Sequence, residues 1–391
     1  MPATAPLARA RVYSVDVLRG LIMIIMALDH VRDFFHQPAM TEDPLNPATT
    51  TPALYFTRWI THFCAPLFVL LSGLSVRLMH QRKSTAEISR FLFTRGLWLI
   101  VMEVTIVSFG LTFNPHLNLM ILQVIWAIGV SFLFLALLVF LPWQAVLAIG
   151  ILITCGHNLL DYTQAQPDFK PGVLWEFAHQ TRYTYYPLFG GHGVIVFYPF
   201  LPWVGIMLMG YGLGRLLQAD VAPAQRRKVL VGTGLGMLVL FGVLRGWNIY
   251  GDPQPWAGSF YSFMDVEKYP PSLLYSCATI GPGLLMLAAL EHVRNRVTEI
   301  AKVYGSVPFF YYILHFYLIH LLCVAAFFIS GRGTHEIVDP NVPFLFRPQD
   351  FGYPLWAAYL IWIAVVAVLY RPCKWYSQYK QTHKHWWLSY L

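Results

Sequence analysis

The chain has 391 residues, of which 57% are hydrophobic and only 12% are charged, and its formal net charge is +8. Soluble domains contain about 25% charged residues, so this composition excludes an ordinary soluble domain. Repeated apolar runs of about twenty residues predict a polytopic helical membrane protein. In such a protein the positive charge is expected in loops on one side of the membrane, so it does not indicate nucleic-acid binding. The five cysteines lie mostly within apolar segments and predict packing residues, not a disulfide framework.

We predict an all-α polytopic integral membrane protein with about ten transmembrane helices, formed by residues 1–391 as a single domain. Arg9 and Arg11 precede the first apolar run, and no small-residue cleavage site follows at the right distance, which predicts an uncleaved first span. The predicted spans cover residues 14–36, 55–79, 88–112, 117–141, 143–160, 194–217, 229–249, 271–292, 303–330 and 354–373.

Basic residues gather in alternate connections of this chain, near residues 77–95, 215–228, 294–302 and 371–384. Loops rich in Lys and Arg stay in the cytoplasm, so we expect these connections and both termini to be cytoplasmic, in a bacterial inner membrane. The loops of the opposite side are longer and carry most of the acidic residues. They cover residues 37–54, 161–193, 250–270 and 331–353.

The first predicted span carries charges at both ends of an apolar middle. Each residue of a helix advances by about 100° and 1.5 Å, so Arg19 and His30 point within about 20° of each other and lie about 16 Å apart in height. A charge at the centre of a lipid-facing helix costs about 2.5–3.5 kcal/mol. A shared charged face therefore predicts a cavity lined by protein and partly hydrated. This face collects Asp16, Arg19, Met23, Met26, His30 and Asp33.

An alternative for this span is a signal-anchor helix whose charged ends reach the two membrane interfaces. Asp16 and Arg19 would then be a simple ion pair three residues apart. This alternative does not account for His30 beside Asp29, short of the outer end and on the same face as Arg19. Ionisable residues inside membrane segments are candidate site residues, and we adopt that interpretation.

The second predicted span adds polar side chains at two depths. Arg58 and His62 lie one turn apart in its outer half, where they can meet the outer end of the first span. Asp29 and Asp33 require such partners. Ser72 and Gly73 lie deeper toward the cytoplasmic side, where small residues permit either the approach of a thin ligand or close helix packing.

Two further polar residues interrupt apolar runs. Gln123 lies in the fourth predicted span, and His315 lies in the ninth, where it is expected to face Glu103 of the third. The spacing of Asp29, His30, Asp33 and His36 also suits a metal ion. The adjacent Arg32 and the absence of a known metal signature favour a site without metal. No Gly-x-Ser-x-Gly turn of a nucleophilic serine is present.

Several motifs resemble the transmembrane acyltransferase superfamily. Its acyltransferase-3 branch has an arginine, ten residues and a histidine in the first span, as in Arg19 and His30, and then a Phe-x-x-Ser-Gly pattern, as in Phe68 to Gly73 with one extra residue. A second branch, the bacterial heparan-alpha-glucosaminide N-acetyltransferase-like proteins, resembles this chain over most of its length. The shared stretches begin at Ser14 (Ser-Val-Asp-Val-Leu-Arg-Gly), Ile121 (Ile-Leu-Gln-Val-Ile), Leu201 (Leu-Pro-Trp-Val-Gly), Lys268 (Lys-Tyr-Pro-Pro-Ser) and Val307 (Val-Pro-Phe-Phe-Tyr-Tyr-Ile-Leu-His).

One position departs from the second branch. Its lysosomal member has asparagine where this chain has His30, and its catalytic histidine comes later, before a Trp-Asn-Gly stretch that this chain lacks. The histidine role is therefore carried over to His30 from the acyltransferase-3 pattern only. No heparan-type substrate is carried over.

The resemblance implies transfer of an acetyl group from cytoplasmic acetyl-CoA to a hydroxyl or amine of an envelope glycan, with no metal. His30 is the expected base, because its pKa lies near working pH, and Asp29 or Asp33 is expected to orient its ring. Acceptor-side or supporting roles are expected for His62, Arg58, Gln123 and His315. The expected donor-binding residues are Arg19, Ser72, Gly73, Arg77, Arg82 and Arg95.

Two other classes of function remain open on the sequence. Buried charges and a proline inside a span, Pro282, also fit a transporter of a small polar substrate. No matching inverted halves are visible, and a non-catalytic scaffold does not account for the charged face of the first span. The expected partners are the lipid bilayer, acyl-CoA and the glycan acceptor, not nucleic acid, and a homodimer is left open.

Overall fold

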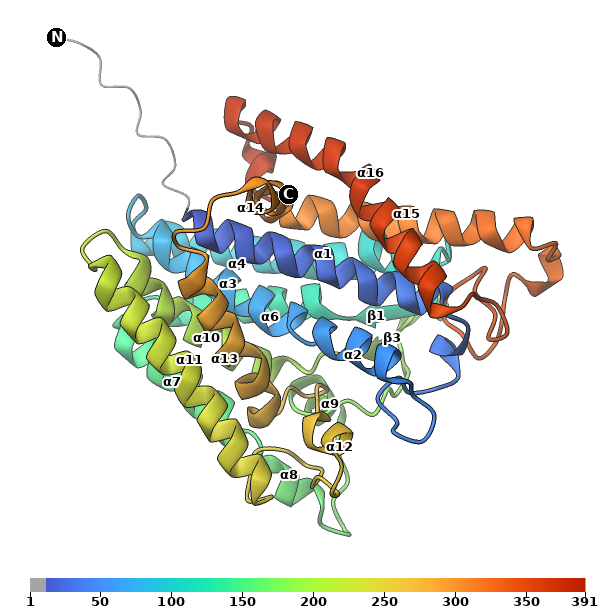
Figure 1. Cartoon of the computed structure of the whole chain (residues 1–391), viewed down its shortest axis with the longest axis horizontal. Helices are drawn as coiled ribbons and strands as arrows, with labels where there is room; N and C mark the ends of the chain where they lie inside the picture. Colours follow the sequence, from blue (N-terminus) through green and yellow to red (C-terminus); the bar gives the residue numbers. More distant parts are fainter. Residues whose placement is uncertain (1–11, 391) are drawn as a thin grey trace.

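The computed structural model describes residues 12–390 and is mostly helical (Figure 1). Arg9 and Arg11 lie outside the described residues. Within residues 12–390, seven helical segments are long and apolar enough to cross a membrane. They are Pro52–Met79, Thr85–Thr112, Trp143–Gln164, Phe200–Leu217, Pro223–Gly246, Pro308–Ile329 and Leu355–Thr382.

The predicted count of ten spans is not confirmed by these segments. Two further predicted spans coincide with shorter apolar helices, α6 (Val124–Leu138) and α13 (Leu273–Ala289). The first predicted span is helix α1 (Tyr13–Phe35), which is long enough but carries charged residues near both ends. The apolar helices nevertheless support an integral membrane protein.

The remaining helices lie within or between these segments. They are α2 (Pro52–Thr61), α3 (Cys64–Met79), α4 (Thr85–Met102), α5 (Ser108–Thr112), α7 (Trp143–Gly156), α8 (Leu159–Gln164), α9 (Val173–Ala178), α10 (Phe200–Leu213), α11 (Pro223–Gly246), α12 (Phe260–Met264), α14 (Arg296–Ser306), α15 (Pro308–Ile329) and α16 (Leu355–Thr382). Short 3₁₀ turns occupy Gln37–Met40, Phe189–Gly191, Gly214–Leu217, Thr334–Glu336 and Trp386–Ser389.

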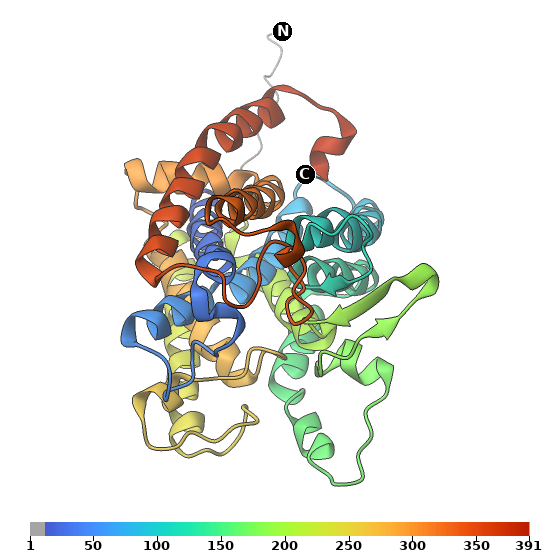
Figure 2. The ribbon, with the colours of Figure 1, turned by 90° about the vertical axis from the view of Figure 1, so that its right-hand side faces the viewer.

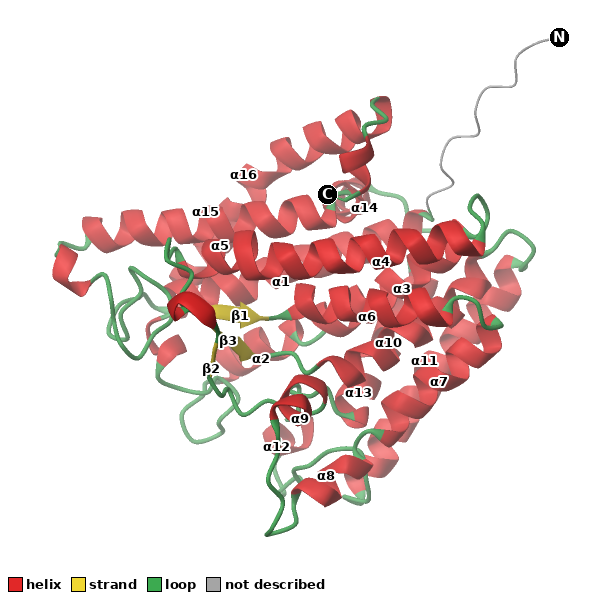
Figure 3. Ribbon diagram, turned by 180° about the vertical axis from the view of Figure 1, so that it is seen from behind, coloured by secondary structure: helices red, strands yellow, loops and turns green. Residues whose placement is uncertain are grey.

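The structure also contains a small sheet within this helical protein. Strands β1 (Met120–Leu122) and β3 (Gly193–Val196) pair in parallel, and β2 (Tyr186–Pro187) pairs antiparallel with β3. Figure 3 shows the sheet among the helices. The all-α prediction is therefore correct only in the main. The predicted spans 117–141 and 194–217 are too long at their starts, because these residues belong to strands.

Connections gather at the two ends of the bundle (Figures 1 and 2). We call the end that carries the loops 36–51, 157–199, 247–272 and 330–354 the His30 end. Figure 2 views the molecule from that end. The opposite end, which we call the Arg19 end, carries the shorter connections 80–84, 214–222 and 290–295. The acidic and basic loops are thus separated along the bundle.

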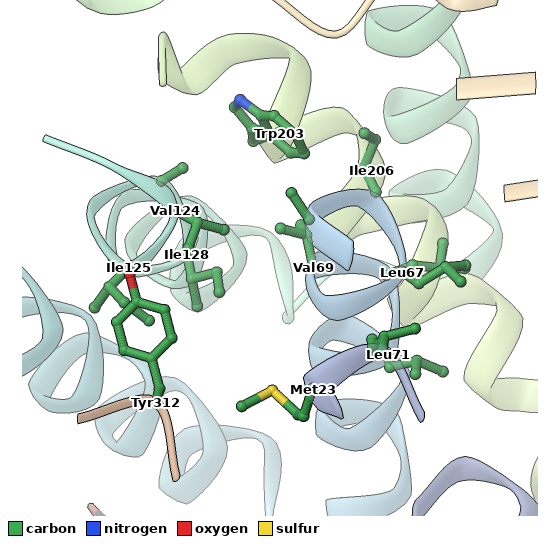
Figure 4. Packing of buried hydrophobic residues seen from close by; sticks show 14 of the residues in the cluster. Met23, Leu67, Val69, Leu71, Val124, Ile125, Ile128, Trp203, Ile206 and Tyr312 are labelled. Atoms are coloured by element: carbon green, nitrogen blue, oxygen red, sulfur yellow. The ribbon is translucent and has the colours of Figure 1, made fainter. Parts of the chain in front are cut away.

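Helix α1 lies inside the bundle and packs against α2, α3, α13, α14, α15 and α16. Its side chains Ile22, Met23 and Ala27 are almost fully buried. Figure 4 shows Met23 next to residues of α3, with Ile125 and Ile128 of α6 and Tyr312 of α15 nearby. The buried core therefore surrounds the charged helix, which places its polar face inside protein and away from lipid.

A break between α2 and α3 follows from Pro66. A proline ring clashes with the carbonyl of the residue four positions earlier and cannot donate a backbone hydrogen bond. That residue is His62, where α2 ends, and its free carbonyl accepts the Tyr275 hydroxyl at 2.8 Å. The break directs α2, with Arg58, toward the His30 end of α1.

A second irregularity is the π-helical turn Glu103–Val107 between α4 and α5. Such turns occur often at functional sites. Glu103 is fully buried, and its Oε1 accepts the backbone N–H of Gln123 at 2.6 Å. The carboxylate therefore satisfies a backbone donor at the start of α6, where helices leave N–H groups without partners.

Helices α1 and α14 approach closely at two glycines. A Cβ on Gly20 would overlap the backbone carbonyl of Ala301, and a Cβ on Gly305 would overlap that of Asp16. Only glycine permits this backbone contact. The pair fixes α1 against α14 at the Arg19 end.

Replacing Gly20 by alanine is expected to destabilise the protein by about 1–3 kcal/mol or more, because overpacking forces the backbones apart. Thermal unfolding of the detergent-solubilised protein measures the effect. The matched control is Gly232→Ala in α11, where a Cβ meets nothing within 4 Å. That control is expected to be neutral or slightly stabilising, since Ala favours a helix over Gly by roughly 0.5–1 kcal/mol. Equal melting temperatures for the two variants would contradict the proposed contact.

Candidate functional site

A cavity of about 240 Å³ lies at the His30 end of α1. Its walls come from α1, α2, α3, α5, β1, α6, α15, the segments that precede α10 and α13, and the loop 330–354. The polar and ionisable lining residues are Asp29, His30, Arg32, Asp33, Arg58, Thr61, Gln123, Lys268, Tyr198, Tyr269 and Tyr312. Four of the residues predicted to form the site besides His30 itself, namely Asp29, Asp33, Arg58 and Gln123, are thus brought together here.

His30 is held in this cavity by ring contacts. Its ring centroid lies 4.3 Å from that of Phe316 and 5.2 Å from that of His315. Among residues 12–390 its ring nitrogens form no hydrogen bond. The imidazole therefore has nitrogens available for a ligand in the cavity.

Asp29 and Asp33 are bound by arginines and not by His30. The Asp29 carboxylate accepts hydrogen bonds from the Arg58 guanidinium at 2.9 and 2.7 Å and lies 3.1 Å from that of Arg32. The Asp33 carboxylate accepts a hydrogen bond from Arg32 at 2.6 Å. The expectation that Arg58 meets Asp29 is confirmed. The expectation that an aspartate orients the His30 ring is corrected, because the arginines engage both carboxylates.

His315 and His62 lie behind the cavity wall, and neither lines the cavity. The His315 Nδ1–H donates to the Tyr311 carbonyl at 3.2 Å, which leaves its buried Nε2 without a hydrogen-bond partner in the described part of the chain. Glu103 bonds to Gln123, so the expected pairing of His315 with Glu103 is not formed. His62 packs its ring 5.4 Å from that of Tyr275.

Sequence reasoning did not assign a site role to Lys268, Tyr269 or Tyr198. Lys268 and Tyr269 belong to the loop between α11 and α13, and Tyr198 precedes α10. All three line the cavity, and the rings of Tyr198 and Tyr269 pack at 5.3 Å. The Lys-Tyr-Pro-Pro-Ser stretch is one of the motifs that resemble the family. Its position beside α1 depends on long-range contacts, which the sequence motif does not reveal.

A buried arginine fastens this loop. Arg245, at the end of α11, donates to the carbonyls of Phe263 at 3.1 Å, Gln254 at 2.6 Å, Ser262 at 2.7 Å and Asp265 at 2.5 Å. One guanidinium thus satisfies four loop carbonyls. The path of the loop from α12 toward Lys268 is fixed by these bonds.

A second buried arginine fastens the end of α1. Arg347 donates to the carbonyls of Asp33 at 3.2 Å and His36 at 2.7 Å, and to that of Phe351. The Asp33 carbonyl lies in the last turn of α1, where carbonyls have no intrahelical partner. The loop 330–354 is thereby tied to the turn of α1 that carries Asp33.

The matched family is described as heparan-alpha-glucosaminide N-acetyltransferase, catalytic, and its model covers residues 11–242. This chain belongs to that family. The matched part includes α1, the small sheet and most of α11, and hence His30, Asp29 and Arg58. Lys268 and His315 lie beyond it. No curated protein matches the sequence.

Membership of this family supports the assignment of the protein as a membrane acetyltransferase. The six residues predicted to bind the acyl donor lie toward the Arg19 end. None of the six lines the cavity. Arg19 donates to Ser75 at 2.7 Å and to the Leu71 and Gly305 carbonyls at 3.3 Å, so it joins α1 to α3 and α14. A Cβ on Gly73 would overlap the Met207 carbonyl, so Gly73 permits close packing of α3 on α10.

The other four expected donor residues are spread over several contacts. Ser72 bonds to the Phe68 carbonyl of its own helix at 2.7 Å, and Arg77 donates to the Tyr211 hydroxyl at 3.2 Å. Arg95 lies over the Trp98 ring at 4.8 Å, and Arg82 is exposed. The structure therefore does not gather the six into one site.

Metal ligands are not grouped in the described residues. No cluster of three or more His, Cys, Asp or Glu side chains able to hold an ion occurs within residues 12–390. Near His30 the carboxylates bind guanidinium groups instead. The donor set of the cavity thus fits anion and hydrogen-bond recognition.

The loop that carries Lys268 contains acids with raised pKa values. Burial raises the pKa of Glu267 from 4.5 to about 7, and burial raises the pKa of Asp265 from 3.8 to about 6. A raised folded-state pKa means that the folded protein holds protons that the unfolded chain has released. This contribution to stability is fully present below pH 4.5 for Glu267 and is lost as the pH rises through about 7.

Glu267 therefore lowers stability as the pH rises between pH 5 and pH 7.5, and we expect Glu267→Gln to remove this contribution from the pH dependence of the melting temperature. Glutamine keeps an oxygen that can accept the Tyr269 N–H, now bound by Glu267 at 2.8 Å. Thermal unfolding at a series of pH values measures the change. Exposed Glu42→Gln is the matched control, and an unchanged pH slope in Glu267→Gln would contradict the assignment.

Proposed function

We propose that this protein transfers an acetyl group from cytoplasmic acetyl-CoA to a hydroxyl or amine of an extracytoplasmic glycan or a related envelope molecule. The observation that carries the proposal is the position of His30, which lies in a cavity at one end of α1 with its ring nitrogens not hydrogen bonded within the described chain. Membership of the acetyltransferase family supports the reaction class. The direction across a bacterial inner membrane, with both termini cytoplasmic, rests on the distribution of basic loops.

In the proposed reaction a nitrogen of His30 accepts the proton of the acceptor hydroxyl or amine. The acceptor oxygen or nitrogen then forms a bond to the thioester carbonyl carbon, the carbon–sulfur bond breaks, and the CoA thiolate leaves. The proton on His30 passes to that thiolate. A positioned base contributes typically about 10²–10⁴ in rate. His315, with its ring 5.2 Å from that of His30, supports the position of the base.

The route of the donor follows the polar face of α1. Arg19 and His30 lie on this face, and Met23 and Met26 lie between them. Met26 lines the cavity, whereas Met23 is 1% exposed and packed in the core between the cavity and Arg19. Methionine side chains are flexible, so we propose that Met23 moves aside when the pantetheine arm enters.

Release of CoA from acetyl-CoA by the purified full-length protein tests this function. We expect release that increases when crude envelope glycan is added, together with acetyl label on the glycan. Transport is the competing function, and it predicts substrate uptake into vesicles without CoA release. A covalent acetyl-histidine route predicts a labelled protein when the acceptor is left out. Absence of CoA release with several acyl donors and intact protein would overturn the proposal.

A further inference from the structure

The cavity carries an excess of positive charge. Its charged lining residues are the cations Arg32, Arg58 and Lys268 and the anions Asp29 and Asp33. With His30 neutral, three positive and two negative charges leave a formal balance of +1. The cavity therefore favours an anion over a neutral or cationic group.

Lys268 is the cation that accounts for this excess. Both aspartates are engaged by Arg32 and Arg58. Within residues 12–390, Lys268 forms no ion pair. Its ammonium hydrogen bonds with the Tyr269 side chain, lies 5.0 Å from the centroid of that ring, and interacts with Asp29 at longer range. The residue is only 8% exposed. An ammonium buried without a carboxylate partner is costly, which is the arrangement expected of a ligand-binding group.

The loop holds Lys268 in place without a ligand. Asp252 accepts the Glu267 N–H at 2.9 Å and the Ser272 hydroxyl at 2.8 Å, and Ser272 N–H bonds to the Glu267 carbonyl at 3.0 Å. These bonds close the turn on both sides of Lys268. A preorganised lysine loses less entropy on binding than a mobile surface lysine.

The remaining walls suit a sugar ring. Aromatic side chains of Phe68, Phe197, Tyr198, Tyr269 and Phe344 line the same cavity. Its volume of about 240 Å³ lies below the roughly 300–1,000 Å³ typical of drug-sized ligands. The space therefore fits one ring-sized group of a larger molecule and not a long chain.

We propose that Lys268 binds an anionic group, a carboxylate or a phosphate, on the acceptor sugar. The inference rests on the proposed function, because it names the chemical class of that acceptor. The ammonium fixes the ring by its charged substituent, while a neighbouring hydroxyl or amine faces His30. Lys268 is therefore a specificity-determining residue that lies outside the part of the chain matched to the family.

Thermal protection of the full-length protein in detergent tests anion binding without any transfer step. A ligand that binds only the folded state raises the melting temperature. The probes are glucuronate, glucose 6-phosphate and inorganic phosphate, with glucose as the neutral control. We expect glucuronate or glucose 6-phosphate to stabilise the wild type, and the two sugars separate a carboxylate site from a phosphate site.

The variants are Lys268→Met, which removes the charge, and Lys268→Arg, which keeps it. Lys268→Met is expected to raise the Kd for the anionic sugar, derived from thermal protection, about tenfold or more, as for the loss of a charged hydrogen bond. Lys268→Arg is expected to retain most of the wild-type affinity. The matched control is Lys170→Met, an exposed lysine at the same end of the molecule. Equal protection of wild type and Lys268→Met, or no protection of the wild type by any anion, would overturn the inference.

Failure of the two proposals can be told apart. Protection by an anionic sugar without CoA release retains the anion site and removes the acetyltransferase function. CoA release without protection by any anionic sugar retains the acetyltransferase function and removes the anion site. Where both are present, Lys268→Met is expected to raise KM for an anionic amino sugar relative to KM for glucosamine. An equal rise for both acceptors would mean that Lys268 only supports the fold.

Discussion

Replacing His30 by glutamine is expected to lower acetyl transfer by about 10²–10⁴, the typical contribution of a positioned base. Glutamine retains polar atoms in the cavity but cannot accept the acceptor proton at neutral pH. The His30 ring packs against Phe316 and His315 and forms no hydrogen bond within residues 12–390, so its loss removes little support from the fold. Glycan-stimulated CoA release measures the rate.

The matched control for this variant is His36→Gln, at the end of the same helix. The His36 Nδ1–H donates to the Tyr353 carbonyl at 3.3 Å, which a glutamine amide can also do. His36 does not line the cavity. We expect the control to keep most of the rate and both variants to keep the wild-type melting temperature within a few degrees. Full activity in the folded His30→Gln protein would remove His30 from the mechanism.

The geometry within α1 was predictable because it depends only on helical periodicity. Residues three, four and seven apart share a face, so the positions of Met26, His30 and Asp33 on one side follow from the sequence, and all three line the cavity. Arg58 was also within reach of prediction, since a buried acid requires a partner and the second predicted span begins at the same side. Its ion pair with Asp29 has that origin.

Contacts between distant segments were not predictable. Lys268 reaches the cavity because Arg245 and Asp252 fold its loop over the helix ends, and no local pattern encodes that path. The strand β1 was hidden in a run of apolar residues, where a short strand and a buried helix look alike. Arg19 shares the predicted face of α1, but packing against α3 and α14 engages its guanidinium, which periodicity alone does not reveal.

Replacing Arg58 by methionine is expected to destabilise the protein by about 3–5 kcal/mol, the usual cost of removing one partner of a buried ion pair. Arg58 and Asp29 side chains are only 15% and 13% exposed. The variant leaves Arg32 as the one ion-pair partner of Asp29 among the described residues, and Arg32 also binds Asp33 at 2.6 Å. Two carboxylates then share one guanidinium at the cavity wall. Thermal unfolding with and without a stabilising ligand measures the loss.

The double variant Asp29→Asn, Arg58→Met separates the pair from the general loss of packing. Removing both charges avoids a buried carboxylate without its partner, so the double variant is expected to be more stable than Arg58→Met alone. A double-mutant cycle then gives the coupling between the two residues, which for contacting residues is about 0.5–3 kcal/mol. Additive effects of the two substitutions would show that Arg32 alone satisfies Asp29. Coupling at the upper end of that range would make the Asp29–Arg58 pair the contact that holds α2 against the histidine-bearing turn of α1.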